Sequence, residues 1–493
     1  MTFDINARAS AVAIETKFQT AGLAGRFLPQ RIAVVGQGNT DAVYSADKRQ
    51  VTSAFEVGGI YGFGSPLYLA IEKLLPANGD GVGSIPVTVY PLVDDVSGVA
   101  ALGDIIPSGA QLEIAAYRIS INNILSAPFV ITPGDLVADI VTAMTTAVNS
   151  VLGMPVVATD NTTEIILTAK WKGESSNDLK IAVIGSTTAG TVFGITQPKD
   201  GAANPDVQSA LDKMGSIWET LVLNCLNKTD TVALDRYKDF GEGRWQPIVK
   251  KPLIVFSGDV NLTVAAAVAI PEARKTDRVN AQLVSPGSLD LPFVVAARQL
   301  ARIAVVAKDN PPTGYSGLVA DGLTPAADED EWDYTERDEA IKKGSSTITV
   351  ENGQVVCGDI VTFYHPDGDP EPAYRYVVNI VKLQNITYNM NLIFTAPEWR
   401  ASPLVPSLIA DNNPTVNPNA RSPASARAEI AGLLDFLGSW AFISDPADSK
   451  KKTVAQIDEF NPNRLDIKLF IKLSGNTRII AIIENFSFFF GGA

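Results

Sequence analysis

The sequence predicts an α/β core domain interrupted by a small inserted α+β domain, then a strand-rich α+β C-terminal domain, with extended strand arms at both chain ends. Three patterns lead to this prediction: a strand–helix–strand order that stops near residue 98 and resumes near residue 206, a self-contained α+β pattern between them, and apolar strands without local partners at the two ends. The 493 residues suffice for about three domains of roughly 150 residues each. A hydrophobic content of 46% and a charged content of 19% are typical of folded domains.

The first residues are predicted to form an extended arm. Phe3, Ile5 and the alanines up to Ala11 alternate with polar residues, as in a strand with one apolar face. No turn signal bounds this stretch as a hairpin, so its hydrogen-bonding partner must come from elsewhere.

The core domain begins with a short apolar strand over Arg31–Val35. A helix over Ser65–Leu75 and a strand over Val87–Tyr90 follow, which is the order of an α/β unit. The α/β pattern returns after the insertion, over Asp206–Met214, Thr220–Leu226, Pro252–Phe256 and Leu291–Lys308. The last of these segments is predicted to be a long buried helix.

The insertion combines strands with one amphipathic helix. Gln111–Ile121 alternates apolar and polar residues, as in a half-buried strand. We expect a helix with Thr132 as its N-cap and Pro133 at its first position, ending at Gly153. Three further strands are predicted over Val156–Thr159, Glu164–Lys170 and Leu179–Ile184.

Beyond Trp332 the sequence favours strands, and a single helix is expected over Ser425–Trp440. The predicted strands are Thr347–Val350, Val355–Tyr364 and Tyr374–Ile380.

Two consecutive strands end the chain. Arg464–Leu473 alternates strictly, with one apolar face made of Leu465, Ile467, Leu469, Ile471 and Leu473. Arg478–Phe490 is apolar on both faces, and its residues include Ile480, Ile482, Phe486 and Phe488. A strand that is apolar on both faces must be covered on both sides. We therefore expect it to complete a sheet shared between subunits.

These patterns divide the chain into five parts. They are an N-terminal arm (1–20), the α/β core (21–97 and 198–330), an inserted peripheral α+β domain (98–197), a C-terminal domain (331–462) and a C-terminal strand arm (463–493).

Composition excludes several classes of function. The net charge of −14 argues against binding to nucleic acid, which requires a basic surface. One histidine and two distant cysteines exclude multi-histidine metal centres, zinc sites and a disulfide scaffold, so we expect no cofactor. No apolar run reaches the ~18 residues of a membrane span, and Met1–Asp4 does not begin a secretory signal. We expect a reducing, soluble compartment and no membrane insertion.

The Gly36-Gln37-Gly38 turn after the first strand raises the alternative of an α/β nucleotide-binding enzyme. The dinucleotide fingerprint requires a third Gly or Ala, and Asp41 stands at that position. An acidic side chain there would repel a pyrophosphate, so a turn that ends a strand is the preferred interpretation. No set of nucleophile, base and orienting group can be assembled from the remaining residues.

Lys450, Lys451 and Lys452 form the one dense basic run of this acidic chain. Such a run is usually a solvated surface, and the alternative is a docking patch for an acidic partner.

The order of these segments resembles the tail sheath proteins of contractile phages, specifically the Mu-like branch. The resemblance covers most of the chain and rests on these segments: Phe3–Ala11, Gly36-Gln37-Gly38, Leu167–Glu174, Ala203–Leu211, Pro292–Val306, Gly317–Leu323, Tyr334–Arg337, Thr347–Tyr364 and Asn461–Asp466.

The resemblance implies a structural protein without enzymatic activity. Sheath subunits stack as hexameric rings around the tail tube and add terminal strands to neighbouring subunits. The sheath as a whole shortens when these rigid subunits rearrange. It implies three kinds of partner besides the chain itself: the tail tube, baseplate and tail terminator proteins. It also implies a place in the virion tail, after assembly in the host cytoplasm, and a C-terminal region facing the tube, where Lys450–Lys452 would make contact. The sheath of a non-phage contractile injection machine remains an alternative.

Overall fold

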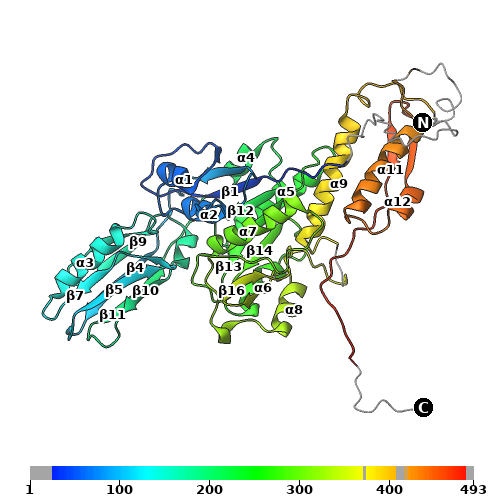
Figure 1. The fold of residues 1–493 in the computed structure, drawn as a ribbon. Coiled ribbons are helices and arrows are strands. Elements are labelled where there is room, and N and C mark those ends of the chain that lie inside the picture. The colour runs from blue at the N-terminus through cyan, green and yellow to red at the C-terminus, as the bar shows by residue number, and fades with distance from the viewer. Residues whose placement is uncertain (1–24, 370–372, 407–416, 418, 485–493) are drawn as a thin grey trace, which may run out of the picture. The chain divides into compact units, whose positions relative to one another are not determined.

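The computed structural model describes residues 25–369, 373–406, 417 and 419–484 (Figure 1). The chain divides into two compact units: Met1–Arg26 with Ile386–Gly475, and Phe27–Asn385 with Asn476–Ala493. The predicted arm residues Phe3, Ile5, Phe486 and Phe488 lie outside the described residues.

The larger unit is built on a six-stranded sheet in the order β14-β13-β12-β1-β3-β2. Neighbouring strands run parallel, except that β2 pairs antiparallel with β3. The strands are β1 (Ile32–Gln37), β2 (Arg49–Val51), β3 (Val87–Leu92), β12 (Leu221–Asn224), β13 (Ile254–Asp259) and β14 (Asn280–Val284). The mixed α/β fold predicted from the sequence is confirmed.

Both faces of this sheet are covered by helices. Along β1, Ile32 and Val34 enter one hydrophobic core, whereas Ala33 and Val35 enter the other, because successive side chains of a strand point to opposite faces. Helices α2 (Pro66–Leu74) and α7 (Pro292–Asp309) contribute to the first core, and α4 (Gln208–Met214) and α5 (Thr231–Trp245) to the second. Two further helices are α1 (Ala54–Tyr61) and α6 (Val264–Glu272).

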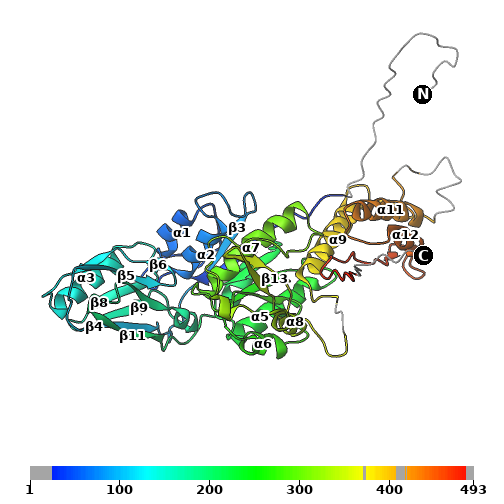
Figure 2. The same ribbon diagram turned by 60° about the horizontal axis from the view of Figure 1, so that its bottom comes forward.

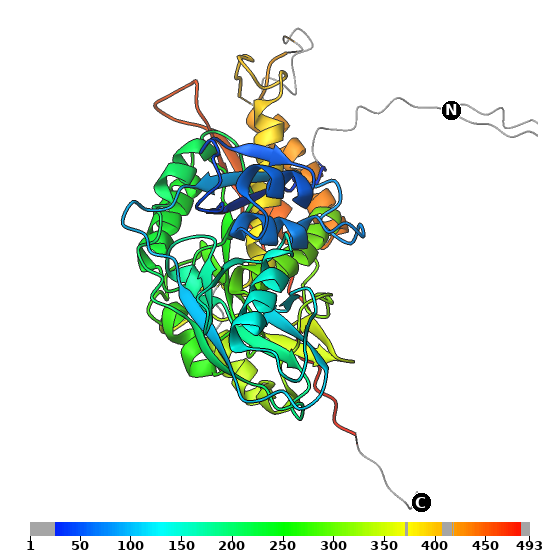
Figure 3. The same cartoon turned by 90° about the vertical axis from the view of Figure 1, so that its left-hand side faces the viewer.

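Residues 102–199 form two antiparallel sheets and one helix, α3 (Val137–Asn149), drawn in cyan and green-blue in Figures 2 and 3. One sheet holds β5 (Ala115–Ile121), β6 (Ile124–Leu125), β7 (Phe129–Ile131) and β10 (Ile181–Gly185). The other holds β4 (Leu102–Ser108), β8 (Val156–Asp160), β9 (Ile165–Ala169) and β11 (Val192–Lys199). The sequence prediction missed β4 and β11.

The predicted start of the helix in this segment is wrong. Helix α3 begins at Val137 rather than at Pro133, and it ends at Asn149 rather than at Gly153. Thr132 instead closes a turn, because its backbone nitrogen and its hydroxyl both donate to the carboxylate of Asp135, each at 2.7 Å. Thr and Asp form such turns as readily as they cap helices.

The prediction of a strand-rich region after residue 331 is also wrong. Tyr374–Ile380 was expected to be a strand, but a 19-residue helix, α9 (Val377–Thr395), begins within it. A short apolar run rich in β-branched residues does not distinguish a strand from a buried helix. Two hairpins of four-residue strands accompany the helices: β15 (Ile348–Glu351) with β16 (Gln354–Cys357), and β17 (Val454–Ile457) with β18 (Leu465–Lys468).

The smaller unit contains α11 (Pro423–Ser439), α12 (Pro446–Lys452) and the β17–β18 hairpin. Its core includes Ile430, Leu433, Leu434 and Leu437 of α11, all fully buried. The predicted helix over Ser425–Trp440 is thereby confirmed. Among the described residues, no helix has the length and apolar character needed to cross a membrane.

Candidate functional site

The Gly36-Gln37-Gly38 turn does not have the geometry of a phosphate-binding loop. No helix begins directly after it, since the next element is β2. A Cβ atom on Gly38 would lie 2.4 Å from the ring of Tyr44, and one on Gly36 would lie 2.8 Å from the Cβ of Cys225. Close packing within the chain therefore accounts for both glycines.

Gln37, the last residue of β1, lies beside the edge of the sheet where an α/β enzyme would bind its ligand, and its side chain is held by other residues of the chain. In open α/β sheets, ligands bind beyond the carboxyl ends of the strands, at the point where the strand order reverses. That point lies between β1 and β12. The Gln37 amide donates hydrogen bonds to Asp94 Oδ1 at 2.5 Å and to the Lys172 carbonyl at 2.8 Å. These contacts do not support the nucleotide-enzyme alternative.

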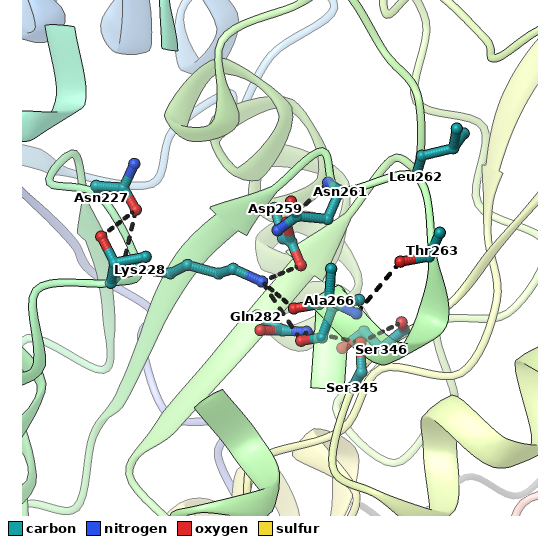
Figure 4. Close-up of polar contacts among 12 residues, drawn as sticks. Asn227, Lys228, Asp259, Asn261, Leu262, Thr263, Ala266, Gln282, Ser345 and Ser346 are labelled. Atoms are coloured by element: carbon teal, nitrogen blue, oxygen red, sulfur yellow. Dashed lines mark hydrogen bonds and ion pairs between the residues drawn. The ribbon is translucent and has the colours of Figure 1, made fainter. Parts of the chain in front are cut away.

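Lys228, which follows β12, and Asp259, the last residue of β13, form a buried ion pair (Figure 4). The two side chains are only 7% and 2% exposed. Lys228 Nζ also donates to the carbonyl oxygens of Ala266 and Ala267 in α6, at 3.3 and 3.4 Å. Asp259 Oδ1 accepts hydrogen bonds from the backbone and side-chain nitrogens of Asn261, at 2.9 and 2.7 Å. Because the chain itself supplies all of these partners, we interpret the pair as structural.

Asp178 lies close to this pair, at the end of a short 3₁₀ helix (Glu174–Asp178) of the inserted segment. Its Oδ2 accepts a hydrogen bond of 2.8 Å from Asn227 Nδ2. Burial raises the pKa of the Asp178 carboxyl to about 7, and the negative charge of Asp259 acts in the same direction. The side chain therefore titrates near neutral pH in the folded protein.

We expect Asp178→Asn to remove part of the pH dependence of stability. Because the folded-state pKa of Asp178 is raised, the folded protein retains this proton, and the free energy of unfolding falls as pH rises from about 4 to about 7. The loss is on the order of 4 kcal/mol and persists at higher pH. Urea unfolding should show the variant to be more stable than the unmodified chain at pH 8 and equally stable at pH 4.

The exposed residue Asp160 offers a control of opposite sign for this prediction. Hydrogen bonds from the Thr142 hydroxyl and the Thr162 backbone lower the pKa of Asp160, so Asp160→Asn should not stabilise the protein at pH 8. Equal stability of Asp178→Asn and the unmodified chain at pH 8 would contradict the assignment.

The described residues contain no group of three His, Cys, Asp or Glu side chains that could hold a metal ion. His365 is buried, and its Nδ1 lies 2.7 Å from the carbonyl oxygen of Phe363. Cys225 and Cys357 are buried free thiols. Packing accounts for the places of all three residues.

The C-terminal stretch begins as one half of a two-stranded sheet. Strand β18 pairs antiparallel with β17, and the chain stays bound further on through Ser444 N donating to Lys472 O at 2.9 Å. The predicted apolar face is half-buried, whereas Lys468, Phe470 and Lys472 are exposed. Its members are Leu465, Ile467, Leu469 and Ile471. The first part of the predicted C-terminal arm therefore pairs within its own chain.

The segment that follows has no cover in the described part of the chain. Residues 479–484, here called the exposed segment, lie in neither a strand nor a helix. Its four isoleucines are almost fully exposed: Ile479 80%, Ile480 74%, Ile482 82% and Ile483 86%. Single exposed apolar residues are common, but a contiguous apolar group marks an interaction site.

Two asparagines of α9 hold the first described residues. Asn389 Oδ1 accepts hydrogen bonds from the backbone nitrogens of Gly25 and Arg26, at 3.1 and 3.2 Å, and its Nδ2 donates to Arg26 O at 2.9 Å. One helical turn earlier, Asn385 Oδ1 accepts from Leu28 N at 2.7 Å. The point at which the N-terminal segment joins the fold is thus fixed by buried amides.

The three lysines of the basic run form the last turn of α12. Lys450 forms an ion pair with Asp435 of α11, and Lys452 forms one with Asp448 at 2.8 Å. Two members of the predicted tube-contact patch are therefore paired with carboxylates of their own chain.

No protein-family model matches the chain. It is 25% identical over 455 residues to the Mu-like prophage FluMu tail sheath protein of Haemophilus influenzae, which covers 90% of this chain and 89% of that protein. This chain is a homologue of a Mu-like tail sheath protein. The resemblance inferred from the order of its sequence segments is confirmed.

One solved structure shares the fold of this chain along most of its length. A chain in the contracted-state baseplate of the anti-feeding prophage matches 97% of this sheath homologue and 99% of its own length, with a TM-score of 0.50 and 11% identity. The sheath tail protein of Desulfitobacterium hafniense matches 94% of the chain and 100% of its own length, with a TM-score of 0.46 and 11% identity.

The sequence analysis did not predict the polar residues of α9 that hydrogen-bond to the first and last described segments of this sheath homologue. Along α9, Lys382, Asn385 and Asn389 are buried and recur at spacings of three and four residues. That spacing places the three side chains on one face of a helix, and it is the signal that could have identified α9.

Proposed function

We propose that the chain is the structural subunit of a contractile phage tail sheath. It polymerises as stacked hexameric rings around the tail tube, and contraction of the polymer drives the tube through the host envelope. It has no enzymatic role. Homology to a Mu-like tail sheath protein over 90% of the chain supports this function, and the exposed segment is the single observation that carries the assembly mechanism.

Strand addition between subunits is the proposed link. The β17–β18 sheet has two strands among the described residues, and a two-stranded sheet is only marginally stable by itself. A neighbour's exposed segment can extend such a sheet, with ladder hydrogen bonds giving strength and alternate side chains giving register. Each hydrogen bond contributes about 0.5–1.5 kcal/mol, and each buried isoleucine contributes roughly 1.5–3 kcal/mol. Such a link is stronger than exposed ion pairs, and can persist while other contacts slide.

The same proposal assigns partners and location. The tail tube, baseplate and tail terminator proteins are the partners besides the chain itself, and the virion tail is the location after assembly in the host cytoplasm. The prophage origin of the Haemophilus influenzae relative favours a phage over a non-phage injection machine.

We also propose that residues 98–197 form a peripheral insertion in the sheath core. Val99 and Ala202 pair with each other through hydrogen bonds of 2.9 and 3.1 Å, so the segment enters and leaves the core through neighbouring positions. This arrangement supports the division into a discontinuous core (21–97 and 198–330) and an inserted domain. The C-terminal domain (331–462) and terminal arms (1–20 and 463–493) complete the division.

We propose that Lys450, Lys451 and Lys452 contact the tail tube. Replacing all three by Glu should leave folding and polymerisation intact, since exposed ion pairs such as those of Lys450 and Lys452 contribute only ~0–1 kcal/mol each. Repeated around the tube, the reversed charges should abolish co-sedimentation of sheath with tube. The double variant Lys342→Glu/Lys343→Glu is the control, because these lysines also form exposed ion pairs. Normal co-sedimentation of the triple variant would exclude the patch from the tube interface.

Negative-stain electron microscopy of the purified chain tests the proposed function. A sheath subunit should form long tubes of uniform diameter, with or without added tube protein. A small closed oligomer that never forms tubes would favour the enzyme alternative over a sheath.

A further inference from the structure

The stretch just before the exposed segment is held at two points. Asn476 Nδ2 donates to Pro312 O at 2.8 Å, and Asn476 Oδ1 accepts from Lys382 Nζ at 3.1 Å. Pro312 lies shortly after the end of α7, and the Lys382 side chain is fully buried in α9. Both partners thus belong to the fixed framework of the larger unit.

Arg478 makes the second attachment. Its Nε donates to Asp359 Oδ1 at 3.0 Å, and its guanidinium carbon lies 3.2 Å from the ring centre of Tyr376. Asp359 is itself fixed, because its backbone nitrogen donates to Thr347 Oγ1 at 3.1 Å. A guanidinium that is both stacked and ion-paired is confined in direction as well as in position.

The contrast with the next residue is abrupt. The Arg478 side chain is hydrogen-bonded and stacked on a ring, whereas Ile479 is 80% exposed. Among the described residues, Arg478 is the last to make a side-chain hydrogen bond, so the exposed segment starts from this anchored point.

We propose that Asn476 and Arg478 form a latch that sets the position and direction in which the exposed segment leaves the subunit, and so determines how it reaches a second copy of this chain. This inference rests on the proposed function. The two residues are positioning residues: they touch the subunit's own framework and do not enter the neighbour's sheet. An anchored segment loses less conformational freedom on pairing than one that swings freely, and this favours assembly.

The test uses the double variant Asn476→Ala/Arg478→Ala in the full chain. Arg278→Ala is the matched control, because Arg278 also stacks on a tyrosine, Tyr374, and pairs with a carboxylate, Glu242 at 2.7 Å. The latch variant should raise the lowest concentration at which tubes form by roughly tenfold, whereas the control should leave it within about twofold.

A second readout does not depend on assembly. Cys225 and Cys357 are buried, so Ile482→Cys introduces one accessible thiol for a fluorescent dye. In dilute, unassembled protein, the latch variant should lower the fluorescence anisotropy of this dye, and Arg278→Ala should not.

The outcomes separate the two proposals. If the unmodified chain forms no tubes, the proposed function fails, and the anisotropy measurement still decides whether the latch exists. If the unmodified chain forms tubes, and the latch variant forms them at the same lowest concentration and shows the same anisotropy, the latch is overturned. A lower anisotropy with unchanged assembly would overturn the inference that the latch directs assembly.

Discussion

Replacing Lys228 by Met is expected to destabilise the protein by about 3–5 kcal/mol, because the substitution leaves the Asp259 carboxylate buried without its cation. Met fills a similar volume, so the loss comes from charge and hydrogen bonding rather than from a cavity. Urea unfolding followed by circular dichroism measures the change.

The double variant Lys228→Met/Asp259→Asn tests whether the loss of stability comes from the unpaired buried charge. Asn retains an oxygen that can accept the hydrogen bonds from Asn261, so removing both charges should restore much of the lost stability. A Lys228→Met variant within about 0.5 kcal/mol of the unmodified chain would contradict a structural role, since that is the range of neutral surface substitutions.

Ending the chain after Arg478 is expected to abolish tube formation and leave a soluble, folded subunit. This truncation removes residues 479–493 but keeps β18 and both latch residues. The isoleucines that it removes make no buried contact within the described chain, so thermal stability should change little. Sedimentation and negative-stain microscopy measure the loss of polymer.

The position of the truncation decides what it tests. Ending the chain after Asp458 instead removes β18, whose backbone pairs with β17, and would damage the smaller unit itself. A variant with Ile479, Ile480, Ile482 and Ile483 all replaced by Thr keeps the length and tests the apolar side chains alone. Tubes of normal abundance from the truncated chain would show that other surfaces link the subunits.

The core could be predicted from the sequence because its periodicity is local and strong. The apolar run of β1, the helix α2 and the buried helix α7 were all identified from patterns local in the sequence. These elements are buried on most sides, so hydrophobic pattern and structure coincide.

The parts that escaped prediction depend on contacts distant in sequence. Val377–Ile380 has the composition of a strand, and only its tertiary setting makes it the start of α9. The Lys228–Asp259 pair joins residues 31 positions apart, and Asn389 binds residues more than 360 positions away. Local spacing can place such polar residues on one face of a helix, but it does not identify their distant partners.

The candidate site was predicted in part. The alternation of Leu465, Ile467, Leu469 and Ile471 gave the correct half-buried face, but the sequence did not show that the same chain supplies the partner strand. The apolar pattern after Arg478 indicated a segment in need of cover, and its isoleucines are exposed.

Amide hydrogen exchange over residues 479–484 tests the central claim, that this segment pairs with a neighbouring subunit, most directly. In unassembled protein these amides lie outside any strand or helix and should exchange within seconds, as exposed backbone does. In assembled tubes, strand addition predicts that exchange of alternate amides slows by orders of magnitude, because a ladder bonds every second N–H to the new neighbour. Equally fast exchange in tubes and in free subunits would contradict the account.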